Sequence, residues 1–514
     1  MNEKKKISHR VVEWFKNPYN LILVGIIIVA TIIRLKYFNI NMGVWWDEGE
    51  YLLKAKNWAF DVPMKDYWNA RPVTLTLIWA LLFKLGANET FIRFMTELVP
   101  SVLSIVFMYL LGKEMYNEKV GLTAAAMLSV FWLHIFFTAR LLMDLPGLFF
   151  ALAAMYFFWK GFIKKQGNKY IYLTAIFTVL TALTKYNDGI IIFIFAITVL
   201  IVERLELFKN KKMWKAIALC VVIFIIPYML FNYLSFGDPL PAITTYILTA
   251  ATSAIQQFES PAWYIFNYFQ EFLFTFWFII FIGGLLTLWR LFLGFDLLLK
   301  RKDTKLIGDL FCVLLIIMPL IFFVFVYKFG VHQYLFLMMP GVFLIMAKGI
   351  TEVGKLLERY NKYLGVALII LVVGIGAYTQ LTQAHQIIEN KKTTYAELKQ
   401  AGIWIKENSD KDDKVMITNN EMEFGAYAEI AYINEGDNQT DFEEILVRER
   451  PKYIVLALFG QNEEFEWIIP LLNTDKERFV PVQAWFSDAE RKQPRVVIYK
   501  VAASNTLGSL PRDQ

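Results

Sequence analysis

Long apolar stretches alternate with short polar ones over most of the chain. The stretches long enough to cross the roughly 30 Å hydrocarbon core of a bilayer lie at residues 19–39, 93–113, 119–138, 145–163, 170–184, 188–203, 215–235, 263–289, 306–327, 334–350 and 363–381. Their length and hydrophobicity predict about eleven transmembrane helices. The composition agrees, because 57% hydrophobic and 17% aromatic residues are too many for an ordinary water-soluble domain. We therefore expect a polytopic α-helical membrane protein.

Basic residues between these stretches predict the orientation. Lysine and arginine cluster in alternate loops, at residues 4–16, 113–119, 160–169, 204–215, 300–305 and 355–362. Cytoplasmic loops carry such an excess, so we expect these loops and the N-terminus in the cytoplasm. Residues 40–92, 139–144, 185–187, 236–262, 328–333 and everything after about 382 are then expected outside. The net charge of +6 is explained by this topology, and we expect a multi-pass protein of the cell membrane with no nucleic-acid partner.

From residue 384 onward the pattern changes to that of a water-soluble fold. Helical periodicity is present at 396–408 and 441–450, and short apolar strands are predicted at 414–418, 453–456, 479–485 and 495–501. These elements predict a small extracytoplasmic α/β domain at 384–502, after a transmembrane domain at 1–383 and before a flexible tail at 503–514. The α/β domain carries no recognisable catalytic motif, so we expect it to serve acceptor recognition or assembly.

The first external segment, residues 40–92, is unusually long and alternates aromatic with charged residues. This pattern predicts helices that lie along the membrane interface. Its apolar part at 73–85 follows Arg71-Pro72 and contains Lys84 near its end. Counting this part as a transmembrane helix would invert every later loop, so we predict a surface helix or a half-inserted helix there.

The start of this segment is the first candidate for chemistry. Trp45-Trp46-Asp47-Glu48 follows the first apolar stretch, so its carboxylates are expected where hydrocarbon gives way to water, beside tryptophans that favour that depth. Acidic residues in such a position are functional candidates. The alternative is an exposed polar loop whose tryptophans only anchor the interface.

A set of basic residues lies on the external side, where the topology predicts few: Arg71, Arg140, Lys185, Lys328 and His332. Each is at a helix end next to a short loop. Cations that gather at the external membrane surface and face carboxylates would suit the phosphate of a membrane lipid. Alternatively, these side chains snorkel to the interface or form structural ion pairs.

The sequence lacks the motifs of several common kinds of site. Cys220 and Cys312 both lie inside apolar stretches, so the sequence predicts no disulfide framework and no thiolate metal site. It contains no Gly-rich phosphate loop and no His-x-x-Glu-His or Cys-x-x-Cys metal motif.

Five motifs, in this order along the chain, resemble one family: Asp47-Glu48, Arg71-Pro72, the stretch Thr138–Pro146, Leu183-Thr184-Lys185 and His332-Gln333-Tyr334-Leu335. They are similar to motifs of the polyprenyl-phosphate-sugar glycosyltransferases of GT-C fold. The resemblance is to the branch that contains the protein O-mannosyltransferases and the lipid A aminoarabinose transferases, glycosyltransferase family 39. It covers roughly residues 20–350.

The resemblance implies an enzyme of GT-C fold that takes a sugar from a dolichyl- or undecaprenyl-phosphate carrier. The sugar would go to a protein, lipid or glycan acceptor outside the cytoplasm, with inversion. By the family's pattern, Asp47 is the catalytic base, and Arg140 and Asp144 match an Arg-x-x-x-Asp motif. The family's Lys-Pro-Pro pattern appears as Arg71-Pro72-Val73, which keeps the cation and loses one proline.

The residue types fit this chemistry. An acceptor must lose a proton to a carboxylate, and the leaving lipid phosphate needs cations. Asp47 suits the first role, and Glu48 or Asp144 could orient the acceptor or hold a divalent cation. The residues expected around the lipid phosphate are Arg71, Arg140, Lys185, His332 and Tyr334.

Two other classes stay open at this point. A transporter or flippase of a lipid-linked or anionic substrate would also place charges in the membrane, but usually at mid-span in broken helices. A binding or scaffold protein would not need the external cations, so substitutions of Arg71 and Lys185 without functional loss would favour that class.

Overall fold

The structure is a computed structural model, and it describes residues 13–38, 42–65, 67–241, 244–245, 277–300, 303–327, 332–459, 467–487 and 493–502. The predicted tail at 503–514 and Lys328 lie outside the described residues. The chain forms two compact units. The first comprises Met1–Asn39, Asn69–Leu75 and Arg93–Glu389, and the second comprises Ile40–Trp68, Thr76–Ile92 and Asn390–Gln514.

The first unit is helical, as the apolar stretches predict. Its elements are α2 (Pro18–Phe38), η1 (Phe94–Leu98), α6 (Val99–Met115), α7 (Glu118–Val130), α8 (Trp132–Phe137), α9 (Asp144–Phe158), η2 (Trp159–Ile163), α10 (Asn168–Thr184), η3 (Tyr186–Ile190), α11 (Ile191–Glu203), η4 (Arg204–Lys209), α12 (Lys211–Cys220), η5 (Val221–Ile225), α13 (Ile226–Phe236), α17 (Trp277–Leu293), α18 (Phe295–Leu299), α19 (Thr304–Ile321), η9 (Phe322–Tyr327), η10 (His332–Met338), α20 (Met339–Glu358) and α21 (Lys362–Lys391). Helices α4 (Thr74–Lys84) and α5 (Glu89–Arg93) lie mostly in the second unit.

Seven of the described helical stretches are long and apolar enough to cross a membrane: Pro18–Phe38, Glu89–Met115, Asp144–Ile163, Lys211–Phe236, Thr304–Phe325, His332–Glu358 and Lys362–Lys391. The chain is therefore a multi-pass membrane protein. Shorter apolar helices such as α10 and α11 lie between them, and the count of about eleven stays a prediction.

Close helix contacts in the first unit use small residues. Helix α6 packs against α7 and α9, and α9 also packs against α10. A Cβ atom on Gly112 of α6 would lie only 2.7 Å from the Cα atom of Gly121 on α7, so only glycine permits this approach.

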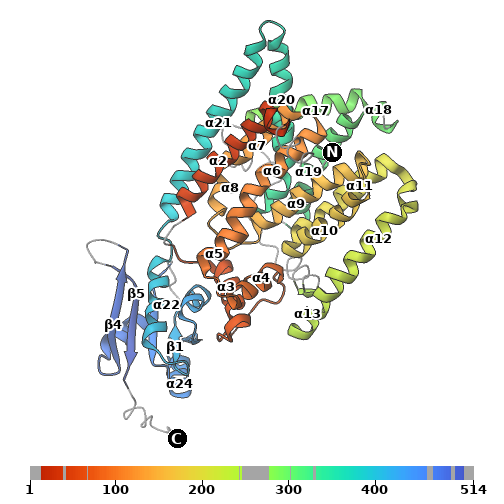
Figure 1. Cartoon of the computed structure of the whole chain (residues 1–514). Helices are drawn as coiled ribbons and strands as arrows, with labels where there is room; N and C mark the ends of the chain where they lie inside the picture. The colour runs from red at the N-terminus through yellow and green to blue at the C-terminus, as the bar shows by residue number, and fades with distance from the viewer. Residues whose placement is uncertain are drawn as a thin grey trace, which may run out of the picture. The chain divides into compact units, whose positions relative to one another are not determined.

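Helices α2 and α21 come from opposite ends of this unit's sequence and lie side by side (Figure 1). The Tyr37 hydroxyl of α2 is 3.2 Å from His385 Nδ1 of α21.

One predicted helix is broken. The sequence predicts a single span at 119–138, but α7 ends at Val130, Phe131 is extended (φ −61°, ψ 119°), and α8 begins at Trp132. The prediction of a continuous helix is therefore wrong. The Trp132 backbone N–H, which the break removes from the helix ladder, donates to Gln380 Oε1 at 3.1 Å. A side chain of α21 thus stabilises the break, and a local sequence pattern does not report this contact.

Two other segments bear on the predicted topology. The surface helix predicted at 73–85 is α4, whose 11 residues span only about 16 Å at 1.5 Å per residue, too short to cross a bilayer. Helix α21 continues to Lys391, ten residues beyond the apolar stretch that predicts it.

The second unit contains α3 (Trp46–Phe60) and an α/β fold built from α22 (Ala396–Asn408), β1 (Lys414–Ile417), α23 (Glu421–Ala428), β2 (Ala431–Asn434), α24 (Gln439–Glu449), β3 (Tyr453–Ala457), α25 (Ile468–Thr474), β4 (Phe479–Phe486) and β5 (Pro494–Val501). The strand order is β2-β1-β3-β5-β4. The first three strands are parallel, and β5 runs antiparallel to β3 and β4.

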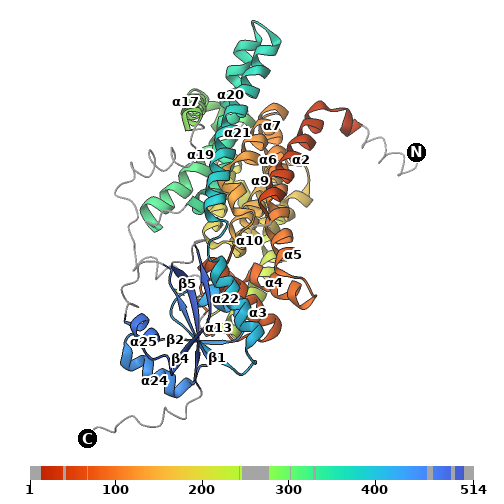
Figure 2. The same cartoon turned by 90° about the vertical axis from the view of Figure 1, so that its left-hand side faces the viewer.

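Helices α24 and α25 cover one face of this sheet, and α22 lies on the other (Figure 2). The core between the sheet and α24–α25 includes Met416, Phe442, Leu446, Ile454, Ile468 and Phe479. The predicted helices at 396–408 and 441–450 and all four predicted strands are confirmed. Helix α23, strand β2 and helix α25 are short and were not predicted from the sequence.

Candidate functional site

Lys185 and Asp144 form a buried ion pair in the first unit. Asp144 is the first residue of α9, and Lys185 directly follows α10. Lys185 Nζ lies 2.7 Å from Asp144 Oδ1 and donates to the Gln333 carbonyl at 2.9 Å. The same Nζ lies 5.4 Å from the centre of the Tyr334 ring. Three distant parts of the chain thus meet at one ammonium group, and two of the predicted cation-site residues, Lys185 and Tyr334, are neighbours.

A second carboxylate, that of Asp188, lies beside this pair and was not predicted from the sequence. Asp188 in η3 is buried, and a Cβ atom on Gly147 would lie 3.0 Å from its Oδ2 atom and 3.5 Å from Lys185 Cβ. Gly147 therefore lets the start of α9 approach both residues. The signal in the sequence is an acidic residue one helical turn after Lys185, just beyond the predicted external turn.

The segment that carries Arg71 is attached to the same end of α10. The Tyr186 hydroxyl donates to the Arg71 carbonyl at 3.5 Å, and the Thr74 hydroxyl donates to the Leu183 carbonyl at 2.7 Å. The Tyr228 hydroxyl accepts from the Val73 N–H and also contacts the Tyr186 hydroxyl. These bonds place Arg71 next to the residues that flank Lys185.

Arg140 and His332 occupy other positions in this unit. Arg140 lies between α8 and α9, is fully buried, and has its guanidinium carbon 5.7 Å from the centre of the Phe136 ring. His332 begins η10, and its ring centre is 5.7 Å from that of Trp132. Since Tyr334 follows two residues later, η10 carries both His332 and a ring that contacts Lys185.

Asp47 and Glu48 begin α3 in the second unit, and their side chains lie in different environments. Asp47 is exposed, whereas Glu48 is fully buried. Glu48 Oε2 accepts the Trp45 N–H at 2.9 Å and so caps the first turn of its own helix. Glu50, a third carboxylate of this turn, accepts the Trp68 N–H at 2.7 Å. Glu48 therefore holds the backbone just before Asp47, and Glu50 connects α3 to the backbone at Trp68.

The C-terminal fold holds α3 through Lys56. This ammonium donates to the Ala426 carbonyl at 2.6 Å and to Glu429 Oε1 at 2.7 Å, at the C-terminal end of α23. Burial acts to raise the pKa of Glu429, but the charges of Lys56 and Lys406 outweigh it and lower that pKa. A cation at a helix C-terminus also interacts favourably with the helix dipole. Residues 40–68, which contain α3, and the C-terminal fold are thus parts of one unit.

Part of the chain that carries these residues matches a known protein family. Residues 70–231 match the family model of the dolichyl-phosphate-mannose-protein mannosyltransferases, and this range contains Arg71, Arg140, Asp144 and Lys185. No sequence among the curated proteins matches the chain.

Solved structures resemble the chain over nearly its whole length. ArnT from Cupriavidus metallidurans in the apo state has a TM-score of 0.64 at 11% identity and covers 93% of this chain and 97% of its own. The archaeal oligosaccharyltransferase AglB from Archaeoglobus fulgidus has a TM-score of 0.57 at 13% identity and covers 96% of this chain and 75% of its own. The chain has the GT-C fold.

The resemblance to GT-C sugar transferases is therefore confirmed. A third similar structure, the arabinofuranosyltransferase AftD from Mycobacteria, has a TM-score of 0.54 at 10% identity and covers 95% of this chain and 40% of its own. The matching family and these three neighbours are all glycosyltransferases.

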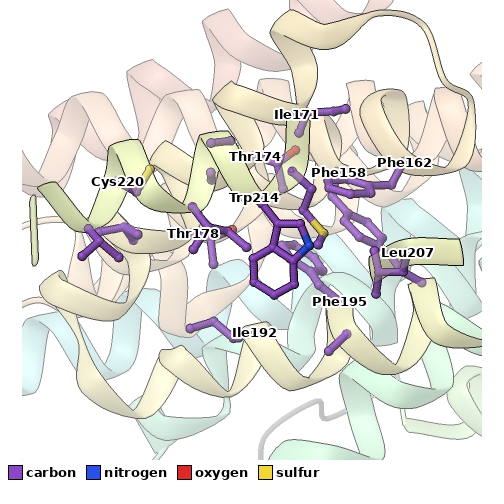
Figure 3. Close-up of a pocket in the computed structure, with 18 of the residues that line it drawn as sticks. Phe158, Phe162, Ile171, Thr174, Thr178, Ile192, Phe195, Leu207, Trp214 and Cys220 are labelled. Atoms are coloured by element: carbon purple, nitrogen blue, oxygen red, sulfur yellow. The ribbon is translucent and has the colours of Figure 1, made fainter. Parts of the chain in front are cut away.

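The GT-C chain also contains an apolar cavity of about 420 Å³ in its first unit. Its walls come from α9, α10, α11 and α12 with the turns beside them, and Trp214 lies at its centre in Figure 3. The lining consists of apolar side chains, Cys220 and two threonines, Thr174 and Thr178. Such a surface fits hydrocarbon and offers no group for proton transfer.

Among the residues that the structure describes, no group of three or more His, Cys, Asp or Glu side chains is arranged to hold a metal ion. Asp144 is already paired with Lys185, and Glu48 caps α3.

Proposed function

We propose that this GT-C protein transfers a sugar from a polyprenyl phosphate, dolichyl or undecaprenyl, to a protein, lipid or glycan acceptor on the extracytoplasmic face of the membrane. The observation that carries this proposal is the buried Lys185 ammonium at the end of α10, between Asp144 and the Gln333–Tyr334 backbone. It lies in the segment that matches the mannosyltransferase model. A buried cation of this kind is suited to a phosphate, since charge-assisted hydrogen bonds are the strong ones.

The reaction needs one base and one anion site. Asp47 takes the proton from the acceptor's hydroxyl or amine, and the acceptor atom attacks the anomeric carbon from the face opposite the phosphate, so the configuration inverts. The bond between the anomeric carbon and the phosphate oxygen breaks, and the electron pair leaves with the lipid phosphate. Lys185, Arg71, Arg140 and His332 stabilise this developing negative charge.

Asp144 orients Lys185, and Tyr334 covers it. The ammonium is held at fixed distances by a carboxylate and a carbonyl, so it needs no rearrangement when charge develops on the phosphate. Glu48 acts through the backbone, because its hydrogen bond to Trp45 starts the helix on which Asp47 lies.

The apolar cavity supports a lipid donor. Its wall includes Ile171, Thr174, Ala175, Thr178 and Val179, whose spacing places them on one face of α10. Lys185 follows this helix six residues beyond Val179, about 9 Å along the axis. A phosphate at Lys185 and a hydrocarbon chain in the cavity would therefore share one helix.

Two neighbours support the class of carrier. ArnT from Cupriavidus metallidurans has been solved bound to undecaprenyl phosphate, and AglB in complex with an inhibitory peptide and a dolichol-phosphate. The loop charges of this chain support a cytoplasmic N-terminus and an extracytoplasmic C-terminal fold.

The test offers purified full-length protein in nanodiscs a panel of polyprenyl-phosphate sugars with candidate peptide, lipid and glycan acceptors. The expected result is release of polyprenyl phosphate with sugar on one acceptor, lost in Lys185→Met. Movement of intact lipid-linked sugar between leaflets, without transfer, would instead support the transporter class and refute the proposal.

A further inference from the structure

Helix α23 of the C-terminal fold packs directly against the first turns of α3. A Cβ atom on Gly49 would lie 2.9 Å from the carbonyl carbon and oxygen of Met422 and 3.0 Å from the backbone nitrogen of Glu423. No side chain fits between the two helices at this point. The start of α23 is therefore fixed beside the helix turn that carries Asp47.

Glu423 has an unusual environment for a carboxyl group. It is 2% exposed, and its Oε1 atom accepts one hydrogen bond, from Asn420 Nδ2 at 3.0 Å. Its Oε2 atom is buried and has no hydrogen-bond partner among the described residues. A buried carboxylate with so little compensation is costly when ionised, which favours the protonated form.

Asn420, the donor to Glu423, has an unusual backbone conformation. Its backbone is left-handed (φ 59°), a conformation that asparagine tolerates better than most residues. Its own Oδ1 atom is also buried without a hydrogen-bond partner in the described part of the chain. Two unsatisfied polar atoms thus lie at the start of α23, next to α3.

The charges that act on Glu423 come from both helices. Burial is the main cause that raises its pKa to about 7. Hydrogen bonds from its own backbone N–H and from Asn420 lower this pKa, and the charges of Glu421 on α23 and Asp47 on α3 raise it by smaller amounts. The third neighbour is Tyr395, just before α22, whose pKa burial and the charge of Glu423 raise. Lys56 and Lys406 pair with Glu429 at the opposite end of α23.

We propose that Glu423 is a positioning residue for Asp47: it keeps its proton below about pH 7, and its Oε2–H group orients the Asp47 carboxylate through one water. Asp47, oriented in this way, receives the acceptor's proton. Loss of the Glu423 proton removes the donor and adds a like charge beside Asp47, so turnover falls. This role rests on the proposed function, and it gives the C-terminal fold a part in catalysis.

The activity test compares the pH profile of sugar transfer in wild type, Glu423→Gln and Glu423→Ala. We expect wild-type kcat to fall above about pH 7. Glu423→Gln keeps a neutral donor and should lose this fall, whereas Glu423→Ala should be at least tenfold slower throughout with an unchanged KM for the lipid donor. Glu435→Gln is the matched control. Burial, with the charges of Glu421 and Asp437, raises the pKa of this carboxyl, and Asp47 is not among the causes. This variant should keep the wild-type profile.

A second readout does not need activity. Infrared titration of full-length protein should show a protonated carboxyl band that disappears near pH 7, is absent in Glu423→Gln, and titrates at lower pH in Asp47→Asn. An unchanged band in Asp47→Asn, or a wild-type profile in Glu423→Gln, would overturn the positioning role. Failure of wild type to transfer any sugar would refute the proposed function, while the infrared result still decides whether the two carboxyls are coupled.

Discussion

Substitution of Lys185 tests whether its side chain serves only as the structural partner of Asp144 or also binds the lipid phosphate. Lys185 Nζ is 2.7 Å from Asp144 Oδ1, and the two side chains are only 9% and 8% exposed. Lys185→Met leaves Asp144 buried without this counter-charge, with Asp188 as a further buried carboxyl beside it. Breaking one partner of such a pair costs about 3–5 kcal/mol of unfolding free energy, whereas replacing both partners by apolar residues is often close to neutral.

The double variant Lys185→Met/Asp144→Leu therefore supplies the control. We expect it to recover most of the stability lost in Lys185→Met, as measured by denaturant unfolding in detergent. Its binding of polyprenyl phosphate should stay weak, because a charge-assisted contact is worth about 1.5–3 kcal/mol and its loss corresponds to roughly 10- to 150-fold in Kd.

Two results would contradict this reasoning. A loss below about 1 kcal/mol in Lys185→Met, the range of exposed pairs, would show that the pair is not effectively buried. Wild-type affinity for polyprenyl phosphate in the stable double variant would remove Lys185 from the anion site and leave it a structural residue.

Four further predictions use other parts of the chain. Asp47→Asn should bind the donor almost normally and lose about 10²–10⁴ in single-turnover rate; near-normal turnover would exclude Asp47 as the base. Arg71→Ala should weaken donor binding by roughly tenfold or more, which a binding titration checks against Lys84→Ala. A cysteine at Asn438 should react with an impermeant thiol reagent only from outside the cell, and labelling from the cytoplasm alone would invert the topology. Burial raises the pKa of Glu435 from 4.5 to about 8, so its stabilising contribution is full below about pH 4.5 and is lost as the pH rises through 8. Glu435→Gln should accordingly exceed wild type in unfolding free energy at pH 9 by on the order of 4 kcal/mol, and equal pH dependence in the two proteins would contradict this.

The secondary structure of the C-terminal fold was largely predictable because periodicity is a local property. Leu398, Ala401 and Ile405 are buried on one face of α22, and the spacing of apolar residues in its sequence shows that face. The short β2 strand was missed, since its four residues Ala431–Asn434 carry too little periodic signal and are stabilised by pairing with β1.

The membrane helices were predictable for a similar reason. Whether a stretch crosses a bilayer depends mainly on the hydrophobicity of its own residues and on the charges that flank it. The break at Phe131 was not predictable in this way, because it is stabilised by the Gln380 side chain, which lies 248 residues from Trp132.

The sequence by itself determined the membrane class, the fold family and the residue types of the candidate site, all of which follow from local hydrophobicity, charge and short motifs. Only the tertiary structure decided which of these residues meet. Lys185 is paired with Asp144, 41 residues away, and bonded to Gln333, 148 residues away, while Glu423 reaches the turn of Asp47 through helix packing at Gly49. Such contacts depend on how distant helices pack, and packing is a property of the whole chain that no local pattern records.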